Sequence, residues 1–137
     1  MNIKYINYFL LITLTGASYP SAANTNGELA KDDQKIITAS LEKELPMVNV
    51  SDLSIGDLVI KGGFPGHAVV IVDMAQNKEG KKIVMIAQSY MPAQNIHVLR
   101  NAVKDGLSPW QEIDNVANFI TPEWTFYDFR NHIRRYK

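Results

Sequence analysis

His67 is the side chain in this sequence that is best placed to do chemistry. It follows the turn Phe64-Pro65-Gly66 and opens the apolar run Ala68–Val72, so a buried strand can hold it while it still meets solvent. Gln88 ends a second apolar run, Lys82–Gln88, and an antiparallel pairing of the two runs brings it toward His67. A histidine with a polar group that orients it is the base half of a nucleophile–base–orienter arrangement.

The nucleophile half of such an arrangement is missing. The chain contains no cysteine, which excludes a thiol nucleophile on chemical grounds. Several serines are available, but none lies in a G-x-S-x-G elbow. A hydrolase would therefore use His67 as a general base on water or on a serine. The alternative is that His67 is a strand-start residue hydrogen-bonded to the backbone.

A metal site is a weaker possibility. The candidate ligands are His67, Asp73, His97 and Asp57, and their spacing matches neither H-x-x-x-H nor H-E-x-x-H. Asp73 lies at the far end of the His67 strand, roughly 20 Å away at the strand rise. The sequence therefore predicts no metal and no cofactor. His132 stands in a basic tail, where we expect it to be solvated.

A set of polar and aromatic side chains forms the candidate binding group. Two tryptophans stand beside prolines, in Ser108-Pro109-Trp110 and Pro122-Glu123-Trp124, and such indoles pack on a domain surface or line a groove. Core and rim packing of a small sheet is the alternative for these aromatic residues. The candidate binding residues are Ser89, Tyr90, His97, Trp110 and Trp124.

The elements that must position these residues are strands and one helix. Short apolar or β-branched runs predict strands at Leu58–Ile60, 68–72, 82–88 and 96–99. Ile37, Leu41 and Leu45 recur four apart and Pro46 follows, which predicts one amphipathic helix over a sheet face. The fold class is α+β, a small antiparallel sheet with one N-terminal helix. The tail from Tyr127 onward is expected to be a short helix or strand with its charges in water.

The N-terminal residues have the three parts of a secretory signal peptide. Lys4 supplies a positive start, Tyr8–Leu14 is a short apolar core, and Ser21-Ala22-Ala23 offers small residues for cleavage. We therefore expect a signal peptide at 1–23, a flexible leader at 24–31 and a single α+β domain at 32–137. This organisation predicts a periplasmic or secreted bacterial protein with no stable membrane anchor after cleavage.

The charge balance bears on the partners. The chain has 14 basic and 14 acidic residues, and Lys4 is the only charged residue before Asn24. Removing the signal peptide leaves 14 − 1 = 13 basic residues against the same 14 acidic ones. A net charge so close to zero argues against a nucleic-acid partner and against a polybasic membrane contact.

Three strings carry a family resemblance: G-D-L-V-I-K-G-G-F-P-G-H-A-V-V-I-V-D, A-Q-S-Y-M-P-A-Q and T-P-E-W-T-F. From about Ser40 to Phe126 the chain resembles an uncharacterised family of secreted bacterial proteins, classed as a domain of unknown function. The first string is also similar, more loosely, to NlpC-type papain-like cell-wall peptidases. That similarity implies a papain-like core in which His67 is the base and Gln88 the orienter, with a cysteine on an upstream helix.

The chain departs from that pattern because it has no cysteine and carries a signal peptide and short leader in the upstream region. It looks like the C-terminal half of such a domain. The resemblance then implies a catalytically silent binding or interaction module at the cell envelope, with a peptidoglycan fragment or an envelope protein as partner. A cell-wall hydrolase that uses His67 as general base, and a truncated gene product without function, are the alternatives.

Overall fold

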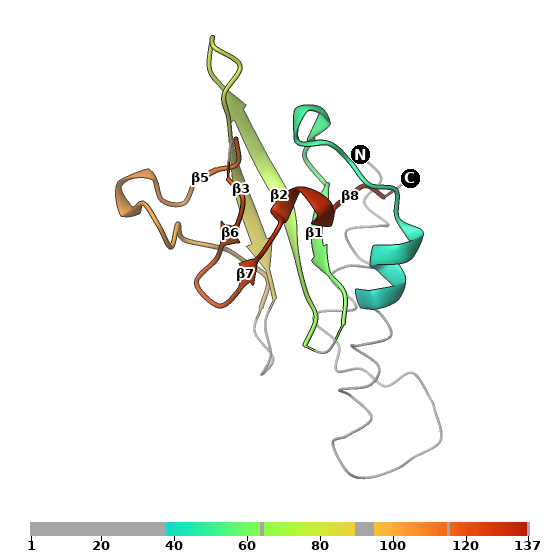
Figure 1. Ribbon diagram of the computed structural model, residues 1–137. Coiled ribbons are helices and arrows are strands. Elements are labelled where there is room, and N and C mark those ends of the chain that lie inside the picture. The colour runs from blue at the N-terminus through green and yellow to red at the C-terminus, as the bar shows by residue number, and fades with distance from the viewer. Residues whose placement is uncertain (1–37, 64, 90–94, 115, 137) are drawn as a thin grey trace.

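The centre of the protein is a six-stranded antiparallel sheet. The computed structural model describes residues 38–63, 65–89, 95–114 and 116–136. The sheet has the strand order β4-β3-β2-β1-β8, and β5 also pairs with β3 (Figure 1). Together with the helix at its N-terminal side, this confirms the α+β class with a small antiparallel sheet. The strands are β1 (Leu58–Lys61), β2 (His67–Gln76), β3 (Lys82–Gln88), β4 (His97–Val98), β5 (Gln111–Glu112) and β8 (Ile133–Arg134).

The β2–β3 hairpin is the longest part of the sheet. Val70 pairs with Ala87 and Ile71 with Ile86, and a register shift follows between Ile71 and Asp73. Alternate side chains of the hairpin point into the core, as the period of two in a strand requires. β2 has a partner on each side, so its apolar run is a central strand, as the sequence predicts.

Short strands complete the outer edge of β3. β4 pairs with its last residues, Gln88 opposite His97, and β5 pairs with its start, Val84 opposite Gln111. The third predicted strand, 96–99, is therefore present as the shorter β4. β3 is hydrogen-bonded along both edges, which fixes the position of both its ends.

A second, two-stranded sheet lies over the core. Figure 1 shows its two short strands, β6 (Phe119–Ile120) and β7 (Thr125–Phe126), beside each other. Phe119 pairs with Phe126, and both rings are buried. Phe129 stacks on Phe119 with ring centroids 4.9 Å apart. These aromatic rings join the buried valines and isoleucines of the main sheet in one hydrophobic cluster.

The N-terminal helix is described over 38–44 and ends before Pro46, as predicted. It packs against the loop after β1 so closely that a Cβ added at Gly62 would lie 2.9 Å from the Ala39 Cα. A glycine at this position lets the helix and the loop meet. None of the helices within the described ranges has the length and apolar character needed to span a bilayer.

The C-terminal tail forms the 3₁₀ turn η3 (Phe129–His132) and then β8, in agreement with the short helix or strand that the sequence predicts. The prediction that its charged groups lie in water is wrong for two residues. His132 is only 8% exposed, and its Nδ1 lies 2.9 Å from a carboxylate oxygen of Glu42. The expectation of a solvated His132 is therefore wrong, because the helix places Glu42 beside it.

Arg135 also departs from the prediction of charges in water. Its Nε donates to Oδ1 of Asp57 at 2.7 Å and its Nη2 donates to Oδ2 at 2.8 Å. Asp57 is 1% exposed and also accepts the Ser54 N–H at 2.8 Å. The hydrogen bonds to Asp57 lower the energy of the charged guanidinium and raise the pKa of Arg135, although burial opposes the shift. The Asp57 carboxylate therefore links the C-terminal tail to the residue just before β1.

Candidate functional site

His67 and Gln88 meet where the β2–β3 hairpin begins and ends. His67 is the first residue of β2 and Gln88 is the last residue of β3. The His67 Nε2 lies 2.7 Å from the Gln88 Oε1. His67 is 7% exposed and Gln88 is fully buried. The antiparallel pairing expected from the sequence therefore places the amide within hydrogen-bond distance of the imidazole.

Glu123 extends this contact into a chain of three side chains. The Gln88 Nε2 donates to the Glu123 Oε2 at 2.7 Å. Because a carboxylate accepts hydrogen bonds, the amide NH₂ of Gln88 must face Glu123 and its carbonyl oxygen must face His67. That oxygen only accepts, so the hydrogen-bond network assigns the hydrogen to Nε2 of His67. In the neutral ring, Nδ1 is then the basic nitrogen.

The surroundings of His67 favour the neutral imidazole. Burial removes water from the ring and lowers the pKa of His67 below its ordinary value of 6.5. The hydrogen bond to Gln88 and the negative charge of Glu123 act in the opposite direction, but burial outweighs them. The hydrogen-bond partner of Nε2 is the neutral amide of Gln88. The Glu123 carboxylate therefore affects the pKa of His67 through its charge and not through a direct hydrogen bond.

Two aromatic rings cover the imidazole. The Trp124 ring centroid lies 5.2 Å from that of His67, and the Phe126 centroid lies 5.8 Å away. Both come from the β6–β7 hairpin, which also carries Glu123. The Trp124 Nε1 is buried and has no hydrogen-bond partner among the described residues. One short hairpin thus supplies both the distal carboxylate and the apolar cover of the site.

A family of domains described as "Domain of unknown function (4846)" matches residues 34–135. The chain belongs to this family. No curated protein and no solved structure matches it. The matched range includes His67, Gln88, Glu123 and Trp124, so the whole site lies in the family domain.

The other predicted binding residues are distributed around this centre. Ser89 directly follows β3 and is 8% exposed. His97 lies opposite Gln88 in the β3–β4 pairing, but it is exposed and its Nδ1 donates to the Asn95 carbonyl oxygen at 2.9 Å. Tyr90 lies outside the described residues. The roles of these residues in binding stay predictions.

Trp110 belongs to a different part of the surface. Its carbonyl oxygen accepts a hydrogen bond from the Asn101 Nδ2 at 2.7 Å, in the segment between β4 and β5. The ring contacts to His67 come from Trp124 and Phe126. Of the two predicted tryptophans, the structure therefore brings only Trp124 to the imidazole.

Glu123 is the site residue that the sequence did not indicate. It lies in the T-P-E-W-T-F string, next to the candidate binding residue Trp124. Glu123 is 35 residues from Gln88, and no short-range pattern indicates such a contact. The sequence indicated this segment only because the string is specific to the family that the chain resembles.

The array can hold a neutral imidazole in one tautomer and orientation, as a general base or a fixed hydrogen-bonding group requires. Among the described residues, no group of three histidine, aspartate or glutamate side chains could hold a metal ion. The polar groups that the structure brings together at the site are the imidazole of His67, the amide of Gln88 and the carboxylate of Glu123.

Proposed function

We propose that this chain is an exported binding module of the cell envelope, with the His67–Gln88–Glu123 array as its ligand site and no thiol reaction of its own. The observation that carries the proposal is a buried, oriented imidazole in a chain without cysteine. An imidazole held in one tautomer offers a fixed hydrogen-bonding group, and Trp124 and Phe126 beside it offer apolar contact area.

The ligand class follows from the resemblance to cell-wall peptidases. A site that keeps the base and the orienter of such an enzyme, but has no thiol, retains groups that position a peptide without cleaving it. Peptidoglycan fragments are therefore the first ligand to test, and a protein of the envelope is the second. Export is supported by the signal-like residues 1–23.

Thermal unfolding with and without peptidoglycan fragments tests this proposal. A ligand that binds only the folded state stabilises it by about 2.7 kcal/mol at a hundred times its Kd, so the Tm should rise. His67→Ala should abolish the rise, whereas Lys78→Ala should leave it unchanged, because Lys78 is exposed in the turn between β2 and β3, at the opposite end of the hairpin from His67. No rise with the wild-type chain, or an equal loss in both variants, would contradict fragment binding at this site.

A second function is favoured by one specific observation. The lowered pKa of His67 leaves its imidazole unprotonated at neutral pH, which is the form a general base needs. The chain would then be a hydrolase in which His67 activates water or a serine and Gln88 orients the ring. Hydrolysis of peptidoglycan fragments should be measured for the wild-type chain and His67→Ala. Equal rates in the two proteins would end this idea.

A further inference from the structure

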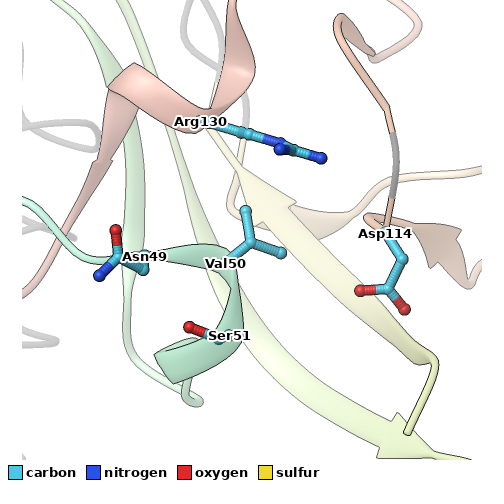
Figure 2. Close-up of a pocket in the computed structure, with 5 residues that line it drawn as sticks. All are labelled: Asn49, Val50, Ser51, Asp114 and Arg130. Carbon is cyan, nitrogen blue, oxygen red and sulfur yellow. The ribbon is translucent and has the colours of Figure 1, made fainter.

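A separate cavity of about 380 Å³ lies away from the His67 array. It is open to solvent and is lined by residues of the 3₁₀ turn η1 (Val50–Asp52), of η3 and of the segments before η1 and after β5, and Figure 2 shows five of them. Lys82, the first residue of β3, donates its backbone N–H to Asp114 in one wall of the cavity. Gln88, which belongs to the His67 array, is the last residue of the same strand. Six residues of strand separate the two places by roughly 20 Å.

Two side chains of opposite charge line this cavity from different elements. In Figure 2, Arg130 extends from η3 toward the side on which Asp114 lies, and the Asp114 carboxylate points away from the guanidinium. The two form no salt bridge. The Arg130 side chain donates no hydrogen bond within the part of the chain that the structure describes. Its guanidinium is therefore available to a ligand.

The Asp114 carboxylate is fixed but only partly used. Its Oδ2 accepts the Lys82 backbone N–H at 2.5 Å. No described residue donates a hydrogen bond to its Oδ1. A carboxylate that is anchored through one oxygen keeps the other in a defined direction, and Asp114 is one of the residues that line the cavity.

Val50 of η1 is the apolar residue that lines the cavity, and a hydrogen bond holds η1 in place. The Val50 side chain rises from η1 toward Arg130 in Figure 2 and packs against the hydrophobic core. The Lys82 Nζ donates to the Ser51 carbonyl oxygen at 2.5 Å, which fastens η1 to the start of β3. The spacing of the walls is thus set by contacts that do not involve a ligand.

We propose that this cavity binds a small zwitterion of the amino-acid or dipeptide type. The Arg130 guanidinium has the fork geometry that binds a carboxylate through two hydrogen bonds, and Asp114 can accept from an ammonium group. Val50 contacts the aliphatic part between them. A volume of about 380 Å³ lies at the lower end of the range of about 300–1,000 Å³ for small-molecule pockets, and a dipeptide fits it.

The pair of charges sets the selectivity. A simple anion would satisfy Arg130 but would lie near the Asp114 carboxylate, and a simple cation would lie near Arg130. Only a ligand that carries both charges, separated by an aliphatic linker, can pair with both Arg130 and Asp114. This site stands independently of what the His67 array binds.

The test is an NMR titration of the full chain with the dipeptide L-alanyl-L-alanine. Backbone amide signals of Val50, Ser51 and Asp114 should shift in a saturable way. The same dipeptide with an acetylated amine, and the one with an amidated carboxylate, should each bind about tenfold or more weakly, because each loses a charge-assisted hydrogen bond. The D,D dipeptide reports on stereochemical preference.

Three variants assign the effect. Arg130→Gln and Asp114→Asn should each weaken binding about tenfold or more, and the asparagine still offers an oxygen to the Lys82 N–H. Arg100→Gln is the matched control, since Arg100 is an exposed arginine on another segment. His67→Ala should bind the dipeptide like the wild type, which separates this site from the array.

Absence of saturable shifts would overturn the proposal, and so would equal binding of the blocked dipeptides. Equal weakening by Arg100→Gln and Arg130→Gln would also overturn it, because it would mean that overall charge rather than the cavity attracts the ligand. Loss of dipeptide binding in His67→Ala would place the ligand in the other site instead.

Discussion

Two buried histidines in this protein have the same exposure but different partners. His67 is 7% exposed and lies 2.7 Å from an amide oxygen, and His132 is 8% exposed and lies 2.9 Å from a carboxylate oxygen. The amide accepts a hydrogen bond without bringing a charge to the ring. Because the burial is nearly equal, the partner makes the difference between the two rings. The Gln88 amide orients His67, whereas the Glu42 carboxylate links His132 to the helix.

The His132 side of the comparison is a structural junction. The Glu42 Oε1 lies beside His132, and the Glu42 Oε2 accepts the Gly62 N–H at 2.8 Å. Arg134 Nε donates to the Glu42 carbonyl oxygen at 3.0 Å. One helical residue thus joins the helix, the loop after β1 and the C-terminal segment. In the His67 array, by contrast, Gln88, Trp124 and Phe126 all contact the same imidazole ring.

The largest effect should come from forcing the helix away from its loop. In Gly62→Ala, the new Cβ would lie 2.5 Å from the Glu42 Oε2 and 2.9 Å from the Ala39 Cα, so the backbone must shift. We expect a loss of about 1–3 kcal/mol in the free energy of unfolding. Urea denaturation measures it. Gly106→Ala is the control, because no atom lies within 4 Å of its added Cβ, and a similar loss there would contradict the close-approach argument.

Removal of the Glu42 side chain should cost less. Glu42→Ala leaves the Gly62 N–H and the His132 ring without their acceptor, and we expect a loss of about 1–2 kcal/mol. For a domain of this size that corresponds to a decrease in Tm of about 4–8 °C per kcal/mol. Glu44→Ala, at an exposed position of the same helix, should change the Tm little. If the two variants unfold at the same temperature, Glu42 is not a junction.

The pH dependence of stability should separate the two histidine sites. The folded pKa of His67 is lowered, so the unfolded chain binds the proton first and stability decreases as the pH falls below 6.5. Burial raises the pKa of Glu42, but the Gly62 N–H and His132 outweigh it and the net shift is downward. Its contribution is present above 4.5 and is lost as the pH falls from there through the folded pKa.

Unfolding free energies measured across this pH range check both windows. His67→Gln should remove the loss that begins near pH 6.5, and Glu42→Gln should remove the loss below pH 4.5. An unchanged pH profile in either variant would mean that another group titrates in that window.

The smallest expected effect is a change in the pKa of His67. Glu123→Gln removes a negative charge that raises the pKa of His67, so the His67 pKa should decrease further. A glutamine at 123 still offers an oxygen to the Gln88 NH₂ group. NMR titration of the ring measures the shift. A His67 pKa that rises in this variant would contradict the three-residue chain.

The sequence predicts the contacts that lie within one hairpin. His67 and Gln88 are joined by a single turn, and strand periodicity places them on one face, so their approach could be predicted. Glu123 and Trp124 come from another hairpin, and no local period gives the angle at which it crosses the sheet. Periodicity describes a segment, whereas the cover of a site depends on how segments pack.

The errors in the tail have the same origin. Glu42 and His132 are 90 residues apart, and Asp57 and Arg135 are 78 residues apart. A basic tail with polar neighbours is ordinarily solvated, and nothing local announces a buried acid elsewhere in the fold. Charge pattern alone could therefore not predict that His132 and Arg135 are held by carboxylates.

The most direct test of the account is an NMR measurement of the His67 ring nitrogens, with and without peptidoglycan fragments. The account predicts a neutral ring with its hydrogen on Nε2 at neutral pH, and His67 signals that shift on addition of fragments while those of His132 do not. A ring that is protonated at neutral pH, or that carries its hydrogen on Nδ1, would contradict the array. A His67 ring that does not respond to fragments would contradict its role as their binding site.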